Sequence, residues 1–102
     1  MQTRYQIIKA SQAAAHLKRL DLLATELRGA SREMGVEISF FGSYAEGRVD
    51  ERSDLDIAIP DDIPASLKRD IVDVMERIAA SRGISIDIVS RTSSREIRCE
   101  LF

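Results

Sequence analysis

Three aspartates alternate with aliphatic residues in two short runs of this chain. Asp54 and Asp56 alternate with leucine and isoleucine in the run 54–59, and Asp87 lies between two isoleucines in the run 84–89. Because successive side chains of a β-strand point to opposite faces of a sheet, each run predicts a strand with one aliphatic and one acidic face. Helices with a single apolar stripe can cover only the aliphatic face. We therefore expect an α+β fold: a small mixed or antiparallel sheet with helices packed on one face and an acidic cleft on the other.

Two amphipathic helices are available to cover the aliphatic face, and the first is predicted from about Ser11 to Met34. Its apolar residues recur at helical spacing, and Gly35 follows as a stop signal. Residues 4–10 either extend this helix or form a separate one, so residues 1–19 are interpreted as an N-terminal helical extension of unknown role. The predicted apolar stripe consists of Leu17, Leu20, Leu23, Leu27 and Met34.

The rest of the chain reads as a continuation of one domain. A strand is predicted over 36–41, ending at the Gly42 turn, and the second amphipathic helix runs from about Ile63 to Ile78 with Pro64 in its first turn. Ser93-Ser94-Arg95-Glu96 is a capping box and predicts a further helix near the end of the sequence. Since no linker or repeat interrupts the pattern, residues 1–102 are interpreted as a single domain.

The composition excludes several classes of protein and of site. With 44% hydrophobic and 31% charged residues, the chain is typical of a globular domain. No apolar run approaches the roughly 20 residues that span a bilayer, so we expect no membrane contact and a cytoplasmic location. The 15 basic and 17 acidic residues are interspersed, which gives no strong nucleic-acid signal. Cys99 is the only cysteine, so no cluster of thiolates is available and a metal would be held by oxygen. His16 is the only histidine, and because it has no partner for a zinc site it is interpreted as a helix-surface residue.

The paired aspartates are suited to bind a divalent cation. Two residues apart on a strand, Asp54 and Asp56 point the same way across about 6.5 Å of rise, which two carboxylates can close around a shared ion. Their oxygens favour Mg²⁺ or Mn²⁺. Asp87, from a neighbouring strand, can complete the metal shell or accept a proton from an attacking hydroxyl. Asp54, Asp56 and Asp87 are therefore the candidate catalytic residues and metal ligands, and two ions are expected because a second would steady a bound triphosphate.

Gly42 and Ser43 supply the second half of this constellation. Gly42 allows a sharp turn and a close approach of phosphate to the main chain, while Ser43 offers a hydroxyl and an N–H at the start of a helix. A phosphate-binding turn beside a metal-binding carboxylate pair is suited to the transfer of a nucleotidyl group from a nucleoside triphosphate. We therefore assign Gly42 and Ser43 to nucleotide and phosphate binding.

The order of these motifs resembles the polymerase β-like nucleotidyltransferase superfamily, whose signature is Gly-Ser, a spacer and Asp-x-Asp, and within it the minimal nucleotidyltransferases. The resemblance covers roughly residues 20–100 and implies the nucleotidyltransferase fold, metal-dependent transfer and ATP as the donor of AMP. It also implies that Asp54 and Asp56 bind metal and that Asp87 is the third catalytic carboxylate. The matching segments are Phe41-Gly42-Ser43, Gly47, Ser53-Asp54-Leu55-Asp56 and Ile86-Asp87-Ile88-Val89.

The resemblance also implies a partner protein. Minimal nucleotidyltransferases are often antitoxins paired with a helical HEPN-domain ribonuclease toxin, which they inactivate by attaching AMP to a tyrosine. This chain is therefore expected to adenylylate a hydroxyl of such a partner. Residues 1–19 are left available for contact with the partner or with a second copy of the chain, so a homo-oligomer stays open.

Two other functions stay open as well. Relatives often have arginines within the phosphate turn, where this chain has Tyr44 and Glu46. The main alternative is therefore a catalytically inactive module of the same fold that neutralises its partner by binding alone. Transfer to a small molecule such as an antibiotic is a third reading, and it would need an acceptor pocket formed by dimerisation.

Overall fold

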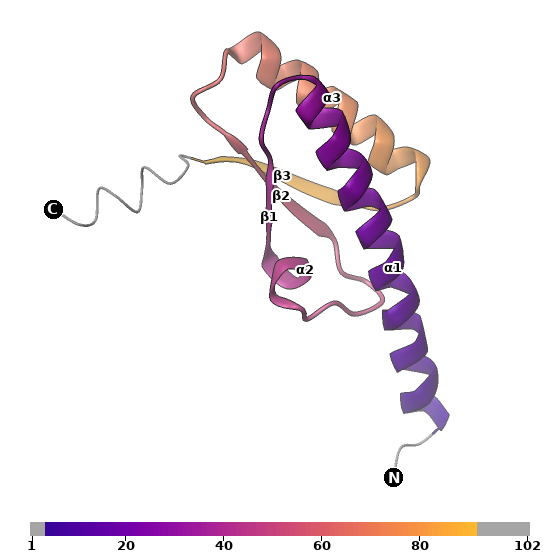
Figure 1. Cartoon of the computed structure of the whole chain (residues 1–102). Helices are drawn as coiled ribbons and strands as arrows, with labels where there is room; N and C mark the ends of the chain where they lie inside the picture. The colour runs from indigo at the N-terminus through magenta and orange to yellow at the C-terminus, as the bar shows by residue number, and fades with distance from the viewer. Residues whose placement is uncertain (1–3, 92–102) are drawn as a thin grey trace, which may run out of the picture.

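The computed structural model describes residues 4–91, apart from the side chains of residues 5–7 (Figure 1). Along the chain the elements are α1 (Arg4–Glu33), β1 (Ser39–Phe41), α2 (Gly42–Glu46), β2 (Leu55–Pro60), α3 (Ala65–Ser81) and β3 (Ile86–Arg91). The helix predicted from Ser93 lies outside the described residues. Among the helices of this part of the chain, none combines the length and apolar character needed to cross a membrane.

The three strands form one mixed sheet in the order β1-β2-β3. β1 pairs with β2 antiparallel, β3 pairs with β2 parallel, and β2 is therefore the central strand. A parallel pair cannot be joined by a tight hairpin, and α3 provides the crossover between β2 and β3 (Figure 1). The α+β fold with a mixed sheet, predicted from the alternating runs, is confirmed.

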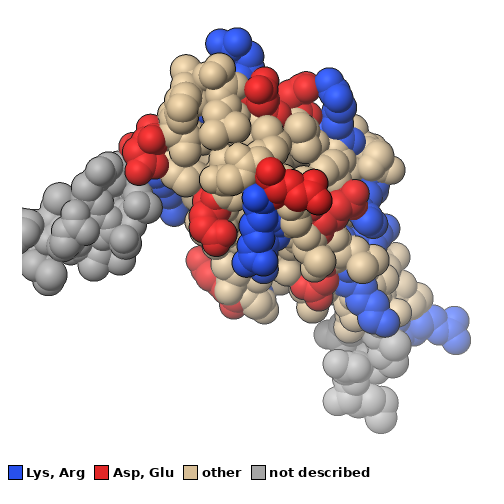
Figure 2. All heavy atoms as spheres, turned by 45° about the horizontal axis from the view of Figure 1, so that its top comes forward, with Lys and Arg blue, Asp and Glu red and all other residues tan. Residues whose placement is uncertain are grey.

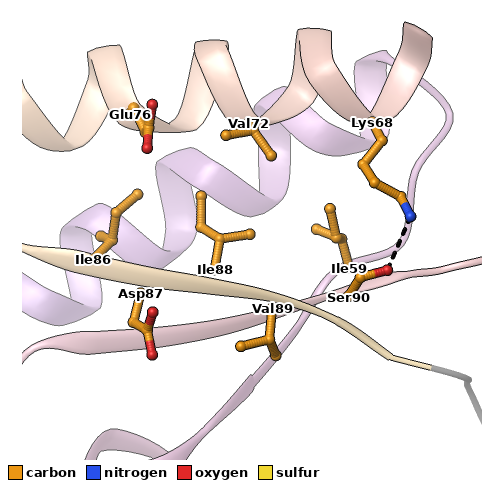
Figure 3. Close-up of a pocket in the computed structure, with 9 residues that line it drawn as sticks. All are labelled: Ile59, Lys68, Val72, Glu76, Ile86, Asp87, Ile88, Val89 and Ser90. Atoms are coloured by element: carbon orange, nitrogen blue, oxygen red, sulfur yellow. Dashed lines mark hydrogen bonds between the residues drawn. The ribbon is translucent and has the colours of Figure 1, made fainter. Parts of the chain in front are cut away.

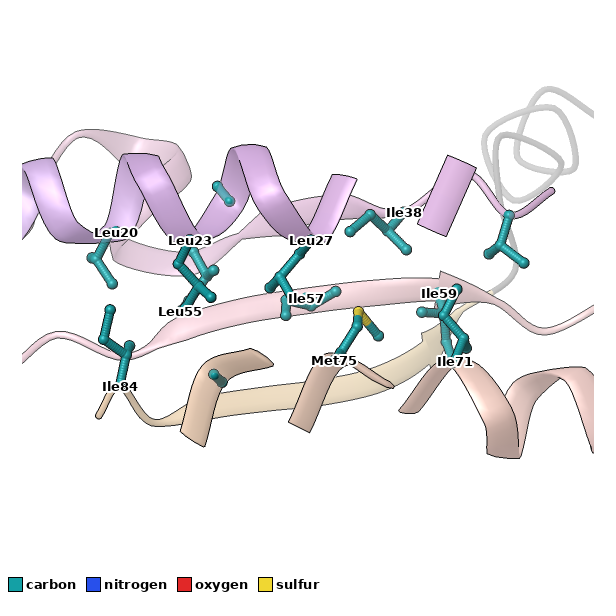
Figure 4. Packing of buried hydrophobic residues seen from close by; sticks show 13 residues of the cluster. Leu20, Leu23, Leu27, Ile38, Leu55, Ile57, Ile59, Ile71, Met75 and Ile84 are labelled. Atoms are coloured by element: carbon teal, nitrogen blue, oxygen red, sulfur yellow. The ribbon is translucent and has the colours of Figure 1, made fainter. Parts of the chain in front are cut away.

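The hydrophobic core lies between the sheet and the two long helices. Leu55, Ile57 and Ile59 of β2 are each at most 2% exposed, as the alternation predicted. The two helices also contact each other, so the aliphatic face of β2 is closed over by both. Complete burial of each such side chain contributes about 1.5–3 kcal/mol relative to exposure. To this cluster α1 contributes Leu20, Leu23 and Leu27, and α3 contributes Ile71 and Met75 (Figure 4).

α1 is one continuous helix, so residues 4–19 are its first half and not a separate helix. Its buried stripe contains Leu20, Leu23 and Leu27 as predicted, but Met34 lies beyond the end of α1 and is only partly buried. Leu17 is 40% exposed, whereas His16 is only 6% exposed. The interpretation of His16 as a surface residue is therefore wrong, and helical spacing explains why: His16 lies four residues before Leu20 and on the same face of the helix.

Two element boundaries differ from the prediction for local reasons. The strand predicted over 36–41 ends at Phe41 as expected but is assigned only from Ser39, because the N–H of Val36 donates to the carbonyl of Ser31 at 2.9 Å and so completes the end of α1. α3 begins at Ala65, and Pro64 precedes it as the N-cap residue where the prediction had put this proline in the first turn.

Candidate active site

The three predicted carboxylates share the face of the sheet that is opposite the core. Asp56 is central, because it is the Cα partner both of Asp87 on β3 and of Phe41 on β1. Asp54 lies two residues before Asp56, immediately ahead of β2, and so has the same parity. Figure 3 shows the Asp87 side chain on the side of β3 that faces away from α3. The register of the sheet thus brings the two motifs of aspartates to one region.

The charges of these carboxylates influence one another. The pKa of the Asp56 carboxyl is raised above its usual value, mainly because partial burial disfavours its charged form and further because Asp87 and Asp54 add negative charge nearby. Asp54 and Asp87 are themselves exposed to solvent. The negative charge of Asp56 is therefore the one that the acidic face disfavours most clearly. A bound cation would compensate this charge.

The glycine of the predicted phosphate turn touches this central carboxylate. Gly42 has a φ of +76°, a conformation that disfavours residues with a side chain. A Cβ atom at Gly42 would collide with Oδ2 of Asp56 and lie 3.0 Å from its Cγ. Gly42 and Asp56, which belong to different motifs of the sequence, are therefore in direct contact, and only glycine leaves room for this contact.

The turn itself is the short helix α2, and it is tied to α1. The N–H of Arg48 donates to the carbonyl of Ser43 at 2.8 Å, which closes the turn behind Gly47. The hydroxyl of Tyr44 donates to Oδ1 of Asp21 on α1 at 2.6 Å. Burial, together with this hydrogen bond, raises the pKa of Tyr44 to about 12. The phenol therefore stays protonated at neutral pH and holds the turn against the helix.

Two basic side chains near the site, Arg48 and Arg91, have defined partners. Arg48 forms an ion pair with Glu46 of the same turn. Arg91 was not among the predicted site residues, yet its guanidinium lies 4.0 Å from the centre of the Phe41 ring. Since Phe41 is on β1 and Arg91 on β3, this side chain crosses the acidic face above β2. Its shared parity with Asp87 is visible in the sequence, but its contact with Phe41 is not.

The chemistry of the donor set fits a hard divalent cation. Asp54, Asp56 and Asp87 offer only carboxylate oxygens, which Mg²⁺ and Mn²⁺ prefer. Within residues 4–91, no three acidic, histidine or cysteine side chains are already gathered closely enough to hold a metal ion. Repulsion between like charges, which also raises the pKa of Asp56, favours such a separation.

The acidic cleft expected over this face stays a prediction. A pocket of about 320 Å³ lies instead between α3 and the edge strand β3, where Val72 and Ile88 line it and Lys68 donates to the hydroxyl of Ser90 at 3.0 Å (Figure 3). Asp87 is one of the residues that line this pocket, although its side chain points away from α3 (Figure 3). On the face drawn in Figure 2, acidic and basic side chains alternate without forming a continuous basic stripe within the described residues.

Comparisons with known proteins agree with these features. A family model described as "Nucleotidyltransferase domain" matches residues 20–99, a range that includes all five predicted site residues. The protein adenylyltransferase MntA of Thermococcus cleftensis is 35% identical over 80 residues, which make up 76% of this chain and 79% of the relative. No solved structure matches the chain significantly.

Proposed function

Because the chain belongs to the nucleotidyltransferase family, and within it to the minimal nucleotidyltransferases, we propose that it transfers AMP from ATP to a hydroxyl group of a partner protein in the cytoplasm. The relative's name, protein adenylyltransferase, supports both the transferred group and the class of acceptor. The observation that carries the proposal is the contact between Gly42 and Asp56. At this contact the phosphate turn meets the carboxylate whose pKa is influenced by the charges of Asp54 and Asp87.

The chain's own groups divide the binding of the nucleotide between them. Gly42 lets the phosphate turn lie directly against Asp56, and the Ser43 hydroxyl and N–H would donate hydrogen bonds to a phosphate. Arg91 offers a positive charge on the same face, and its contact with Phe41 restricts where that charge can move. These groups together would fix the triphosphate above Asp56.

Asp54, Asp56 and Asp87 would hold Mg²⁺, with Mn²⁺ as the alternative and two ions as the expected number. When bound, the metal supplies positive charge that steadies the triphosphate and the departing pyrophosphate and favours ionisation of the attacking hydroxyl. Because burial, and further the charges of Asp87 and Asp54, raise the pKa of Asp56, the apo site is less stable than it would be with that charge compensated.

The transfer itself is a single displacement at the α-phosphorus of ATP. The acceptor oxygen forms a bond to this phosphorus while the bond to the oxygen bridging the α- and β-phosphates breaks, and pyrophosphate leaves. The acceptor's proton passes to Asp87, whose carboxylate is exposed on an edge strand where a protein surface can approach. Holding the attacking oxygen in line is the main task of the site, since phosphoryl transfer depends chiefly on positioning and charge.

The partner that we propose is a helical HEPN-domain ribonuclease, which the chain inactivates as an antitoxin by adenylylating a tyrosine. The test is incubation of the purified chain with Mg²⁺, ATP labelled in the α-phosphate and the product of the neighbouring gene. We expect label on the partner with the wild type and none with Asp54→Asn or Asp56→Asn. Labelling by these variants at the wild-type rate would overturn the assignment of the site.

A contact-only inhibitor is the second candidate, and the Glu46–Arg48 ion pair favours it. This pair occupies a basic side chain that directly follows the phosphate turn, which lowers the charge available for ATP. The variant with Asp54, Asp56 and Asp87 all changed to asparagine separates the two functions. A transferase loses protection of cells against the partner in this variant, whereas a contact inhibitor retains it.

A further inference from the structure

His16 is a buried histidine whose two ring nitrogens both have partners. Its Nε2 lies 2.7 Å from the carbonyl oxygen of Ser53, and its Nδ1 lies 2.7 Å from Nη2 of Arg19. Arginine can only donate, so Nδ1 accepts and carries no proton. The proton of the neutral imidazole must then be on Nε2, which donates to Ser53. The two partners therefore fix one tautomer and one ring orientation.

The acceptor of this hydrogen bond is the peptide that leads into the metal-binding motif. The carbonyl of Ser53 and the N–H of Asp54 belong to the same planar peptide unit. Fixing that plane limits the rotation that decides where the Asp54 side chain points. β2 begins only at Leu55, so the sheet does not hold the Ser53 carbonyl by itself.

The loop before Asp54 is otherwise held mainly by its own short-range bonds. Asp50 accepts from the N–H of Arg52 at 2.8 Å, and its own N–H donates to the Ser53 hydroxyl at 2.9 Å. A second link to α1 is the ion pair between Lys9 and Glu51, at 2.9 Å. Because the Lys9 side chain is half exposed, solvent screens this pair and weakens it as a constraint. The buried His16 bond is the stronger constraint on the loop.

We propose that His16 is a positioning residue that sets the Asp54 carboxylate beside Asp56 and so raises the affinity of the site for a divalent cation. The proposal rests on the proposed function, since it assumes that Asp54 and Asp56 share the ion. It also assigns a role to the first half of α1: this segment aligns the carboxylate motif. A histidine with a purely structural role would stabilise the fold without changing the affinity for metal.

The experiment measures Mn²⁺ binding directly, from the loss of the electron paramagnetic resonance signal of free Mn²⁺, in the presence of a non-hydrolysable ATP analogue. His16→Leu keeps the apolar volume but removes the donor, and we expect it to weaken Mn²⁺ binding by about tenfold, at the low end for partners of metal ligands. His16→Gln can place an amide N–H near the position of Nε2, so it should restore binding to within about threefold of wild type.

Two controls separate positioning from general stability. Ile71→Val shortens a fully buried core residue on α3, and we expect it to lower the melting temperature without changing Mn²⁺ affinity. Arg19→Met alters an exposed residue and should weaken binding by about twofold to threefold, because the Nε2–H tautomer is no longer enforced. The proposal is overturned if His16→Leu binds Mn²⁺ like the wild type or if Ile71→Val weakens binding as much. Should His16→Leu fail to fold, wild-type affinity in Arg19→Met overturns it.

The same titration keeps this inference apart from the proposed function. If the wild type binds no Mn²⁺, or if Asp54→Asn binds it normally, the assignment of the carboxylates fails and His16 has no site to align. If Asp54→Asn loses binding while His16→Leu keeps it, only the inference about His16 fails. Normal folding of each variant is checked by circular dichroism.

Discussion

The two faces of β2 differ in what they contribute to the molecule. On one face, Leu55, Ile57 and Ile59 are almost completely buried and hold both long helices against the sheet. On the other face, Asp56 contacts Gly42, and its raised pKa shows that its charge is disfavoured there. A single strand therefore supplies the core with one set of side chains and the candidate site with the alternate set.

This difference teaches that stability and function are separable at the level of adjacent residues. The aliphatic face contributes to stability in proportion to the apolar area that it buries. The acidic face lowers the stability of the fold, because it brings carboxylates of like charge close together. This arrangement suits the proposed binding of a cation and is not needed for folding. Substitutions on the two faces should therefore move activity and stability in opposite ways.

The largest expected effect is on the acidic face. Asp56→Asn should lower the rate of AMP transfer by on the order of 10³-fold or more, as expected for a group that acts directly on the transition state. In the absence of divalent cations the same variant should melt at a higher temperature than the wild type, since it removes a disfavoured charge. Transfer assays test the predicted loss of activity, and thermal unfolding tests the predicted gain in stability. If Asp56→Asn is active and less stable than the wild type, the acidic face does not differ from the aliphatic face in the way we infer.

The stability gain of Asp56→Asn should depend on pH in a defined direction. Since the pKa of Asp56 is raised in the folded state, ionisation destabilises the fold. This loss is absent below the unfolded pKa of about 3.9 and develops as the pH rises through the folded value. The difference in melting temperature between variant and wild type should therefore be present at neutral pH and vanish at acidic pH. A gain that is constant across this range would point to packing and not to charge.

The next largest effect is expected one residue away, on the aliphatic face. Ile57→Ala should lower the free energy of unfolding by about 2–5 kcal/mol, because Ile57 is fully buried and the truncation leaves a cavity. Ile57→Val, the matched control, should cost only about 0.5–1.5 kcal/mol. Urea unfolding measures both. At a temperature where the variants stay folded, transfer should be retained, and a selective loss of activity in Ile57→Val would break the separation of the faces.

The alternation of residues made the strand β2 and the α+β class predictable, because burial on a strand has a period of two. The local geometry of the site was harder to predict from the sequence. Whether Gly42 meets Asp56 depends on the pairing of Phe41 with Asp56, which is a register between strands and not a local pattern. The contact of Arg91 with Phe41 has the same origin, since it joins two strands separated by a third.

His16 illustrates a different reason for a missed residue. Its position in the buried stripe of α1 follows from helical spacing. The stripe was predicted from apolar residues alone, however, and so it did not include a histidine. Burial becomes favourable only because Ser53 and Arg19 satisfy both ring nitrogens. The Ser53 carbonyl is distant in sequence, so the chemistry that permits the burial could not be read from α1 alone.

Gly42 joins the two regions, and a substitution there should give a smaller effect than either preceding loss. Gly42→Ala should cost about 1–2 kcal/mol for the positive φ and should also lower transfer by on the order of 10²-fold, because the new Cβ displaces the Asp56 carboxylate. Gly47→Ala is the matched control: its φ is 74°, nearly that of Gly42, but a Cβ there meets no atom within 4 Å. Equal losses of transfer in both variants would mean that backbone strain, and not the contact with Asp56, explains the need for glycine.

The smallest expected effect concerns the bond that attaches the phosphate turn to the helical layer. Tyr44→Phe removes the hydrogen bond to Asp21 and should lower the free energy of unfolding by about 0.5–1.5 kcal/mol, with transfer changed by less than about threefold because no reacting atom is touched. Since the pKa of Tyr44 is raised to about 12 in the folded state, its contribution is complete below the unfolded pKa of about 10 and is lost as the pH rises through the folded value. Unfolding of wild type and variant should therefore differ at neutral pH and converge in strong alkali. If Tyr44→Phe instead abolishes transfer at unchanged stability, Tyr44 belongs to the reacting face, and the division between the layer that stabilises and the face that reacts must be redrawn to include it.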